Sequence, residues 1–356
     1  MFKRLLPLAV LLVLLKAAPA LATPISVYGA WHCGNDACTW ASVRDMTDFD
    51  VKNRWLVDRG DGTGLPSVNL VVLSFVQPLK LLNRTTDAQT LNGVPRGMTP
   101  EVVNYFKSRG VRVMLSVGGI TYVDAWNQAL AQNATQLGLN AAQVAQSLGV
   151  GIEIDYEENT SPNLTGLQAF IDAYRSQLPY DASGANHAAR LTIDLAAGDR
   201  WLIALTRKAT ADWLNTTTPV LDYANAMVES KQATNAAAAQ ANWQEHIDGK
   251  AQYSPPIPPL AAAKFTGALY IVTGQNTCPE CVNFNNSLQK STGNYVQTVQ
   301  TKTGTTNGML GYMFWASECP STRRICTTPP NTCENGVGVG ASTYNIPVPM
   351  PALRQQ

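Results

Sequence analysis

The stretch Val150-Gly151-Ile152-Glu153-Ile154-Asp155-Tyr156-Glu157-Glu158 decides how the rest of the chain is interpreted. Side chains in a strand alternate between its two faces. Glu153, Asp155 and Glu157 therefore share one face, and two isoleucines and a tyrosine share the other. Such a strand either lies at a sheet edge with its acidic face in solvent, or is covered by helices on its apolar face while the carboxylates look into a barrel or cleft.

The second interpretation is favoured because apolar, helix-like sequence precedes the stretch and its other face is Ile, Ile, Tyr. Carboxylates that are buried side by side repel one another and lose solvation. Their pKa values are pushed apart, so that one carboxyl can stay protonated as an acid while its neighbour is ionised. The stretch therefore predicts a catalytic carboxylate site. Glu158 follows the strand end and is expected to be solvated.

Composition sets limits on the partners of the chain. Only 14% of the 356 residues are charged and the net charge is +1, which implies neither nucleic acid nor an anionic membrane surface as a partner. Lys3 and Arg4, an apolar run over residues 5–15 and the small residues before Thr23 are typical of a secretory signal peptide over residues 1–22. We expect a secreted or periplasmic monomer with no membrane segment after cleavage.

Export permits disulfides among the seven cysteines. Short-range pairing is plausible for Cys33 with Cys38, Cys278 with Cys281, and Cys319 with Cys326 or Cys333, which leaves one cysteine over. No second Cys-x-x-Cys motif and no histidine pair completes a zinc site, so we expect neither a metal nor a cofactor.

The rest of the chain alternates between strand-like and helix-like segments. Strands are predicted at residues 25–30, 69–76, 111–117, 190–196, 220–228, 265–273 and 308–315, in addition to the carboxylate strand. One intervening helix has clear signals: Thr99 as N-cap, Pro100 in the first turn and Gly110 beyond the end. The alternation predicts a (β/α)8 barrel over residues 23–318, with its active site at the carboxyl ends of the strands. The segment from Cys33 to Gly64 is read as a loop, and the Cys-, Pro- and Gly-rich residues 319–356 as a tail packed on the barrel.

Two strand ends resemble family 18 glycoside hydrolases. Leu115-Ser116-Val117-Gly118-Gly119 resembles the SxGG signature of their third barrel strand, and the stretch from Gly151 to Glu157 resembles the DGxDxDxE signature of the fourth. Residues 221–227 and 311–315 look like the sixth and eighth strands. The resemblance covers nearly the whole mature chain and is closest to compact chitinases and endo-β-N-acetylglucosaminidases that lack an inserted α+β subdomain.

The resemblance implies a retaining, substrate-assisted glycosidase acting on chitin or chito-oligosaccharides. Glu157 would be the general acid, and the 2-acetamido carbonyl of the substrate would be the nucleophile. Asp155 would hold the acetamido N–H, and Glu153 would sit behind Asp155 and share a proton with it.

Further residues are candidates for binding the sugar. Tyr28 is predicted near the barrel mouth, and Trp315 as a flat platform for a pyranose ring. Ser116 and Gly118 are expected beside the site, where they allow close backbone packing. Met227 and Glu229 lie at sixth-strand positions. Trp31, Trp126 and Trp201 lie near predicted loops or helix starts and are candidates for sugar subsites.

The sequence departs from the family pattern at several positions. Val150 replaces the first Asp of the fourth-strand motif, and Glu153 replaces its second. The usual Met-x-Tyr-Asp of the sixth strand reads Met227-Val228-Glu229-Ser230, and an ionised Glu229 cannot act as a phenol donor. Tyr223, Tyr270 and Tyr312 are the alternatives for that donor.

These departures leave two other functions open. One is an endo-β-N-acetylglucosaminidase acting on N-glycans or peptidoglycan, and the other is a catalytically silent barrel that binds sugar or protein. The three histidines, His32, His187 and His246, are scattered and read as surface residues, which argues against serine-hydrolase chemistry.

Overall fold

The computed structural model describes residues 22–33, 38–196, 198, 201–227, 236–271, 281–282, 286–302, 308–315 and 332–353. Most of the predicted signal peptide, Cys278, Cys319, Cys326 and Glu229 lie outside the described residues, as do the side chains of Tyr270, Cys281 and Cys333, and with them the predicted cysteine pairs other than Cys33–Cys38. None of the described helices combines the length and apolar character that crossing a bilayer requires.

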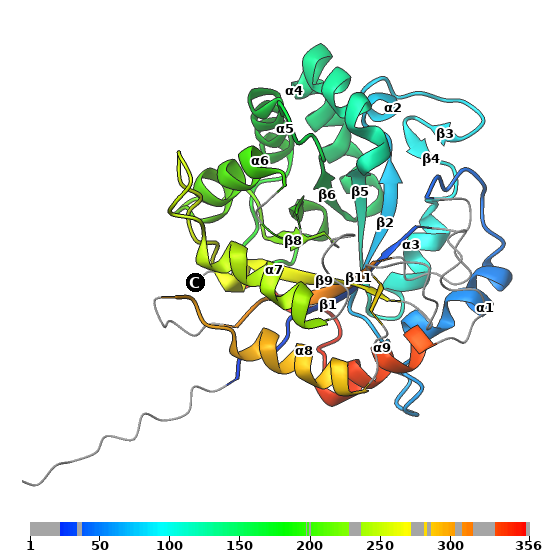
Figure 1. Ribbon diagram of the computed structural model, residues 1–356. Helices are drawn as coiled ribbons and strands as arrows, with labels where there is room; N and C mark the ends of the chain where they lie inside the picture. The colour runs from blue at the N-terminus through cyan, green and yellow to red at the C-terminus, as the bar shows by residue number, and fades with distance from the viewer. Residues whose placement is uncertain are drawn as a thin grey trace, which may run out of the picture.

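The described strands form a closed (β/α)8 barrel, as predicted (Figure 1). In chain order its strands are β1 (Val27–His32), β2 (Leu70–Val76), β5 (Arg112–Gly118), β6 (Gly151–Asp155), β7 (Leu191–Leu195), β8 (Ala224–Ala226), β9 (Phe265–Ile271) and β11 (Gly311–Trp315). Neighbouring strands are parallel, β11 lies between β9 and β1, and pairing of β8 with β9 closes the ring. The short β10 (Cys281–Val282) pairs with β9 outside the ring.

Helices surround this barrel (Figure 1). They are α1 (Met46–Val57), α2 (Pro78–Leu82), α3 (Pro100–Lys107), α4 (Val123–Leu148), α5 (Leu164–Gln177), α6 (Ile203–Lys208), α7 (Ala236–Asp248), α8 (Asn286–Thr298) and α9 (Thr332–Thr343). A small hairpin, β3 (Thr90–Leu91) and β4 (Val94–Pro95), follows α2. Thr99 caps α3 through its side chain, as the sequence predicts.

Two helices occupy segments that were predicted as loop or tail. The side chain of Asp45 caps α1 by accepting from the backbone N–H groups of Thr47 and Asp48. The tail contains α9, which packs beside α8 and α1 (Figure 1). The glycines of α9 disfavour a helix locally, so packing against these neighbours is what stabilises it.

Residue parity divides the barrel strands into an interior and an outer layer. Val27, Leu70, Met114 and Met313 belong to the cluster inside the barrel. Side chains of opposite parity, such as Ile152, pack in the larger cluster beneath the helices. This division decides which strand residues can reach the barrel mouth.

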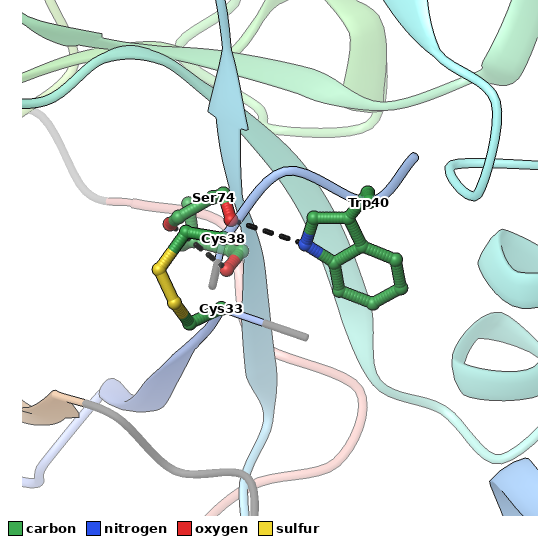
Figure 2. Close-up of a disulfide and its surroundings, with 5 residues drawn as sticks. Cys33, Cys38, Trp40 and Ser74 are labelled. Atoms are coloured by element: carbon green, nitrogen blue, oxygen red, sulfur yellow. Dashed lines mark hydrogen bonds between the residues drawn. A yellow bond between two sulfur atoms is a disulfide. The ribbon is translucent and has the colours of Figure 1, made fainter. Parts of the chain in front are cut away.

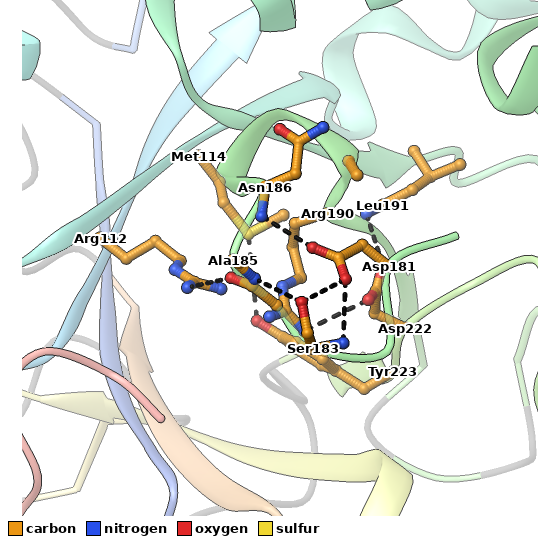
Figure 3. Close-up of polar contacts among 12 residues, drawn as sticks. Arg112, Met114, Asp181, Ser183, Ala185, Asn186, Arg190, Leu191, Asp222 and Tyr223 are labelled. Atoms are coloured by element: carbon orange, nitrogen blue, oxygen red, sulfur yellow. Dashed lines mark hydrogen bonds and ion pairs between the residues drawn. The ribbon is translucent and has the colours of Figure 1, made fainter. Parts of the chain in front are cut away.

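The base of the barrel is closed by polar contacts and by the segment 346–353. Arg190 pairs with Asp222, and Arg112 donates to the carbonyl oxygen of Gly184 at 2.9 Å (Figure 3). Arg59 and Asn69 donate to carbonyl oxygens of the segment at 2.7 and 3.1 Å. Two of its apolar side chains complete the interior cluster from below, namely Met350 and Leu353.

The predicted Cys33–Cys38 disulfide is present, and it lies where β1 ends (Figure 2). The chain after it is tied to the end of β2. Trp40 Nε1 donates to the carbonyl oxygen of Ser74 at 3.0 Å, and the backbone N–H of Phe75 donates to that of Cys38 at 3.1 Å. The disulfide therefore supports the loop that holds Phe75 at the barrel mouth.

Candidate active site

The carboxylate stretch forms β6 and the turn after it. Its outward residues Ile152 and Ile154 are fully covered by the helical layer. Glu153 and Asp155 point inward and are only 0% and 4% exposed. This burial excludes a solvated acidic face, and it places the carboxylates at the carboxyl ends of the strands, where barrel active sites lie.

Glu157 follows β6 and is only partly buried. Desolvation raises the pKa of its carboxyl from 4.5 to about 7, although hydrogen bonds from Asp155 and from the backbone N–H of Ile120 act in the opposite direction. A carboxyl with such a pKa keeps its proton near neutral pH and can donate it. Glu157 therefore has the protonation behaviour of a general acid.

Asp155 lies deeper and shares a hydrogen bond with Glu157. Its pKa is raised well above the usual range, first by burial and then by repulsion from Glu157 and Glu153. Two carboxyl groups in direct contact need a proton between them, so this pair titrates as a unit.

The backbone at Asp155 is fixed by the end of β5 and the start of α4. Its carbonyl oxygen accepts from the N–H of Gly119 and from Trp126 Nε1, both at 3.0 Å. A Cβ atom on Gly118, where φ is +124°, would lie 1.8 Å from this oxygen. Gly118 thus serves close backbone packing, and the fully buried Trp126 is a structural residue that cannot line a sugar subsite.

Glu153 is held behind Asp155 by two neutral donors. Trp31 Nε1 donates to Glu153 Oε1 at 2.8 Å, and Asn225 Nδ2 donates to Oε2 at 2.7 Å. Thr266 Oγ1 donates to Asn225 Oδ1 at 2.5 Å, which orients the amide toward Glu153. Ser116 approaches closely enough to lower the pKa of Glu153, but its oxygen has no partner within hydrogen-bonding distance among the described residues.

One inward carboxyl was missed by the sequence analysis. Asp194 on β7 is 3% exposed and lies within hydrogen-bonding reach of Glu153. Its pKa is raised well above the usual range by burial and then by repulsion from Glu153 and Asp155. The described part of the chain contains no group of three or more His, Cys, Asp or Glu side chains arranged to hold a metal ion.

Aromatic rings gather beside the carboxylates at the barrel mouth. The ring centroids of Trp31 and Trp315 are 6.4 Å apart, and Phe75 stacks on Trp315 at 5.7 Å. Trp315 is partly exposed, which suits a surface for a sugar ring. The sequence analysis did not identify Phe75. The alternation of inward and outward side chains along β1 could have indicated that Trp31, rather than Tyr28, faces the barrel interior.

The position of Tyr28 differs from the prediction that it lies near the barrel mouth. It faces away from the barrel interior and is 0% exposed, with its hydroxyl donating to the carbonyl oxygen of Val337 at 2.9 Å. Tyr312 packs edge-on against it in the same outer layer. Tyr223 points inward, but its hydroxyl contacts Met114 Sδ at 4.0 Å in the interior cluster. Tyr28, Tyr223 and Tyr312 are all fully buried, so none of the three can contact a bound sugar.

The remaining predicted residues have mixed outcomes. Met227 lies just beyond β8, is partly buried and packs against core residues. Trp201 is also partly buried against the core. His32 and His246 are 2% and 1% exposed, which corrects the prediction that they are surface residues. Their pKa values are lowered to about 4, chiefly by desolvation, so both are neutral core groups near neutral pH.

No protein-family model matches the sequence, and no curated protein matches it either. Solved structures do match the fold. A family 18 chitinase from Pseudoalteromonas aurantia aligns with 81% of this chain and 93% of its own, at 12% identity and a TM-score of 0.51. A chitinase from Rhizomucor miehei aligns with 88% of this chain and 99% of its own, at 16% identity and a TM-score of 0.52. The chain therefore has the (β/α)8-barrel fold seen in family 18 chitinases.

Proposed function

We propose that the chain is a secreted, retaining glycosidase that hydrolyses β-1,4 linkages in N-acetylglucosamine polymers by substrate-assisted catalysis. The observation that carries this proposal is the hydrogen-bonded pair of Asp155 and Glu157 at the carboxyl end of β6, in which Glu157 has a pKa of about 7. The fold shared with chitinases and the aromatic residues at the mouth support it.

The contact between the two carboxyl groups favours a nucleophile supplied by the substrate. Inverting glycosidases separate their carboxylates by about 6.5–9.5 Å to admit a water, and retaining enzymes with a carboxylate nucleophile separate them by about 5–5.5 Å. A direct hydrogen bond between Asp155 and Glu157 is shorter than both separations. The acetamido oxygen of a bound N-acetylglucosamine is then the nucleophile.

The reaction follows from the shared proton. When the acetamido N–H of the substrate approaches Asp155, it stabilises the ionised form of Asp155, and the proton that the pair shares is held by Glu157. Glu157 gives it to the glycosidic oxygen as that bond breaks, the acetamido oxygen bonds to the anomeric carbon, and ionised Asp155 balances the positive oxazolinium. Glu157 then takes a proton from the water that attacks the anomeric carbon and opens the oxazolinium ring. The anomeric configuration is retained because the two displacements occur on opposite faces.

One observation favours a second function, a barrel that binds sugar without cleaving it. Of the three alternatives for the missing sixth-strand phenol, Tyr223 and Tyr312 are engaged elsewhere, and the side chain of Tyr270 lies outside the described residues. Without a neutral donor to the acetamido oxygen, a bound N-acetylglucosamine would be poorly oriented for attack. The endo-β-N-acetylglucosaminidase alternative differs from the first proposal only in its glycan.

The test is a turnover assay of the purified chain and two variants. The substrates are chito-oligosaccharides with a fluorogenic leaving group and, in parallel, a high-mannose glycoprotein. We expect Glu157→Gln to abolish hydrolysis and Glu158→Gln, which changes a partly exposed carboxyl after the strand, to retain it. Unchanged hydrolysis in Glu157→Gln would refute the assignment. Saturable oligosaccharide binding without cleavage of either substrate would establish the binding barrel instead.

A further inference from the structure

Asp194 is a buried carboxyl for which the proposed mechanism has no use. It lies on β7 opposite Asn225 of β8, and it has the inward parity that brings it against Glu153 of β6. Burying a third carboxyl beside Glu153 and Asp155 destabilises the fold, which suggests that Asp194 has a role in the charge state of the other two.

The hydrogen-bond donors at this site are distributed unequally. Both oxygens of Glu153 accept from neutral N–H groups, those of Trp31 and Asn225. Among the described residues no donor reaches Asp194 Oδ1, and a hydrogen bond from Asn225 is the only one that lowers the pKa of Asp194. An ionised carboxylate is stabilised by the donors it accepts from, so the negative charge belongs on Glu153.

Within the described part of the chain, no lysine or arginine forms an ion pair that would offset a second charge at this site. Among the described residues, none of the ion pairs involves Glu153, Asp155 or Asp194. The titratable groups that act on Asp194 from the neighbouring strands are Glu153 and Asp155 of β6. These neighbours can carry only negative charge, and each of them therefore opposes ionisation of Asp194.

We infer that Asp194 is a permanently protonated carboxyl whose O–H donates to Glu153, and that it acts as a positioning residue by restricting the charge behind Asp155 to a single ionised group. The inference rests on the proposed function, because its consequence concerns the proton on Glu157. A second ionised carboxylate behind Asp155 would raise the pKa of the acid further and move the alkaline limit of activity upward.

The first test measures the proton directly and needs no activity. A protonated carboxyl has an infrared C=O stretch distinct from that of a carboxylate, and ordinary carboxyls are ionised at pH 8. We expect the intact protein at pH 8 to show protonated-carboxyl absorption that Asp194→Asn reduces. Glu158→Gln is the matched control, since hydrogen bonds from Asn127 and from two backbone N–H groups lower its pKa, and it should leave this absorption unchanged. Asp194→Ser, smaller and also neutral, serves if the Asn variant fails to fold.

The second test is the pH profile of kcat/KM. Asn is neutral and donates a hydrogen bond as a protonated Asp does, so we expect the alkaline limb of Asp194→Asn to stay at the pH of the parent. If Asp194 were ionised, the substitution would remove a negative charge and move that limb to lower pH. Such a shift, or an infrared absorption that Asp194→Asn leaves intact, would overturn the inference. An inactive parent would refute the glycosidase proposal but leave the infrared result decisive for Asp194.

Discussion

Replacing Glu157 by Gln should make the folded protein more stable above neutral pH. The pKa of Glu157 rises from 4.5 to about 7 on folding. The folded state therefore binds more protons than the unfolded state between these values, and stability falls as pH rises through this window. Each pKa unit corresponds to about 1.36 kcal/mol. Ionised Glu157 then lowers the free energy of unfolding by about 3 kcal/mol above pH 7, and Gln does not titrate.

The measurement is urea unfolding of the parent and Glu157→Gln at pH 5 and pH 8. We expect the variant to gain about 2 kcal/mol more at pH 8 than at pH 5, because at pH 5 little of the ionisation cost has been incurred. Glu158→Gln should instead lose nearly the same stability at both pH values, since hydrogen bonds lower the pKa of Glu158 and its stabilising charge is already present at pH 5. A pH-independent difference for Glu157→Gln would refute the argument that burial raises its pKa.

Two further perturbations probe the support of the site. Trp31→Phe removes the N–H donor to Glu153 Oε1, and this should lower the free energy of unfolding in urea by about 2 kcal/mol at pH 8. The loss should be smaller under acidic conditions, where Glu153 is protonated. An equal loss at both pH values would contradict an ionised Glu153. Reduction of the Cys33–Cys38 disulfide should lower the free energy of unfolding by about 2 kcal/mol, and an unchanged midpoint would show that hydrogen bonds alone hold this loop.

The barrel and its carboxylate strand were predictable because they depend on local patterns. Apolar runs such as residues 69–76 indicate strands buried on both faces, and the alternation of Glu153 and Asp155 with isoleucines identifies which face is inward. The N-cap of α3, Thr99, is likewise identified from the adjacent sequence alone. None of these signals requires knowledge of what the segment packs against.

The missed features depend on distant contacts. Asp194 is a lone carboxyl in an apolar strand, and only the folded barrel brings it beside Glu153 and Asp155 of β6. Tyr28 and Trp31 lie on the same strand with opposite parity, so a prediction that ended the strand at residue 30 could not assign the inward ring. The helix α9 is stabilised by α8 and α1 rather than by its own glycine-containing sequence.

The segment 346–353 also determines how the molecule can be attached to a surface. It crosses the base of the barrel, where Met350 and Leu353 enter the interior cluster, while Glu157 and Trp315 lie at the opposite end of the strands. A linker, dye or fusion partner joined beyond residue 353 would leave from the face that points away from the carboxylates. Protein tethered through that end would present its open mouth to a polymer or a cell wall, whereas attachment at the Cys33–Cys38 loop would crowd it.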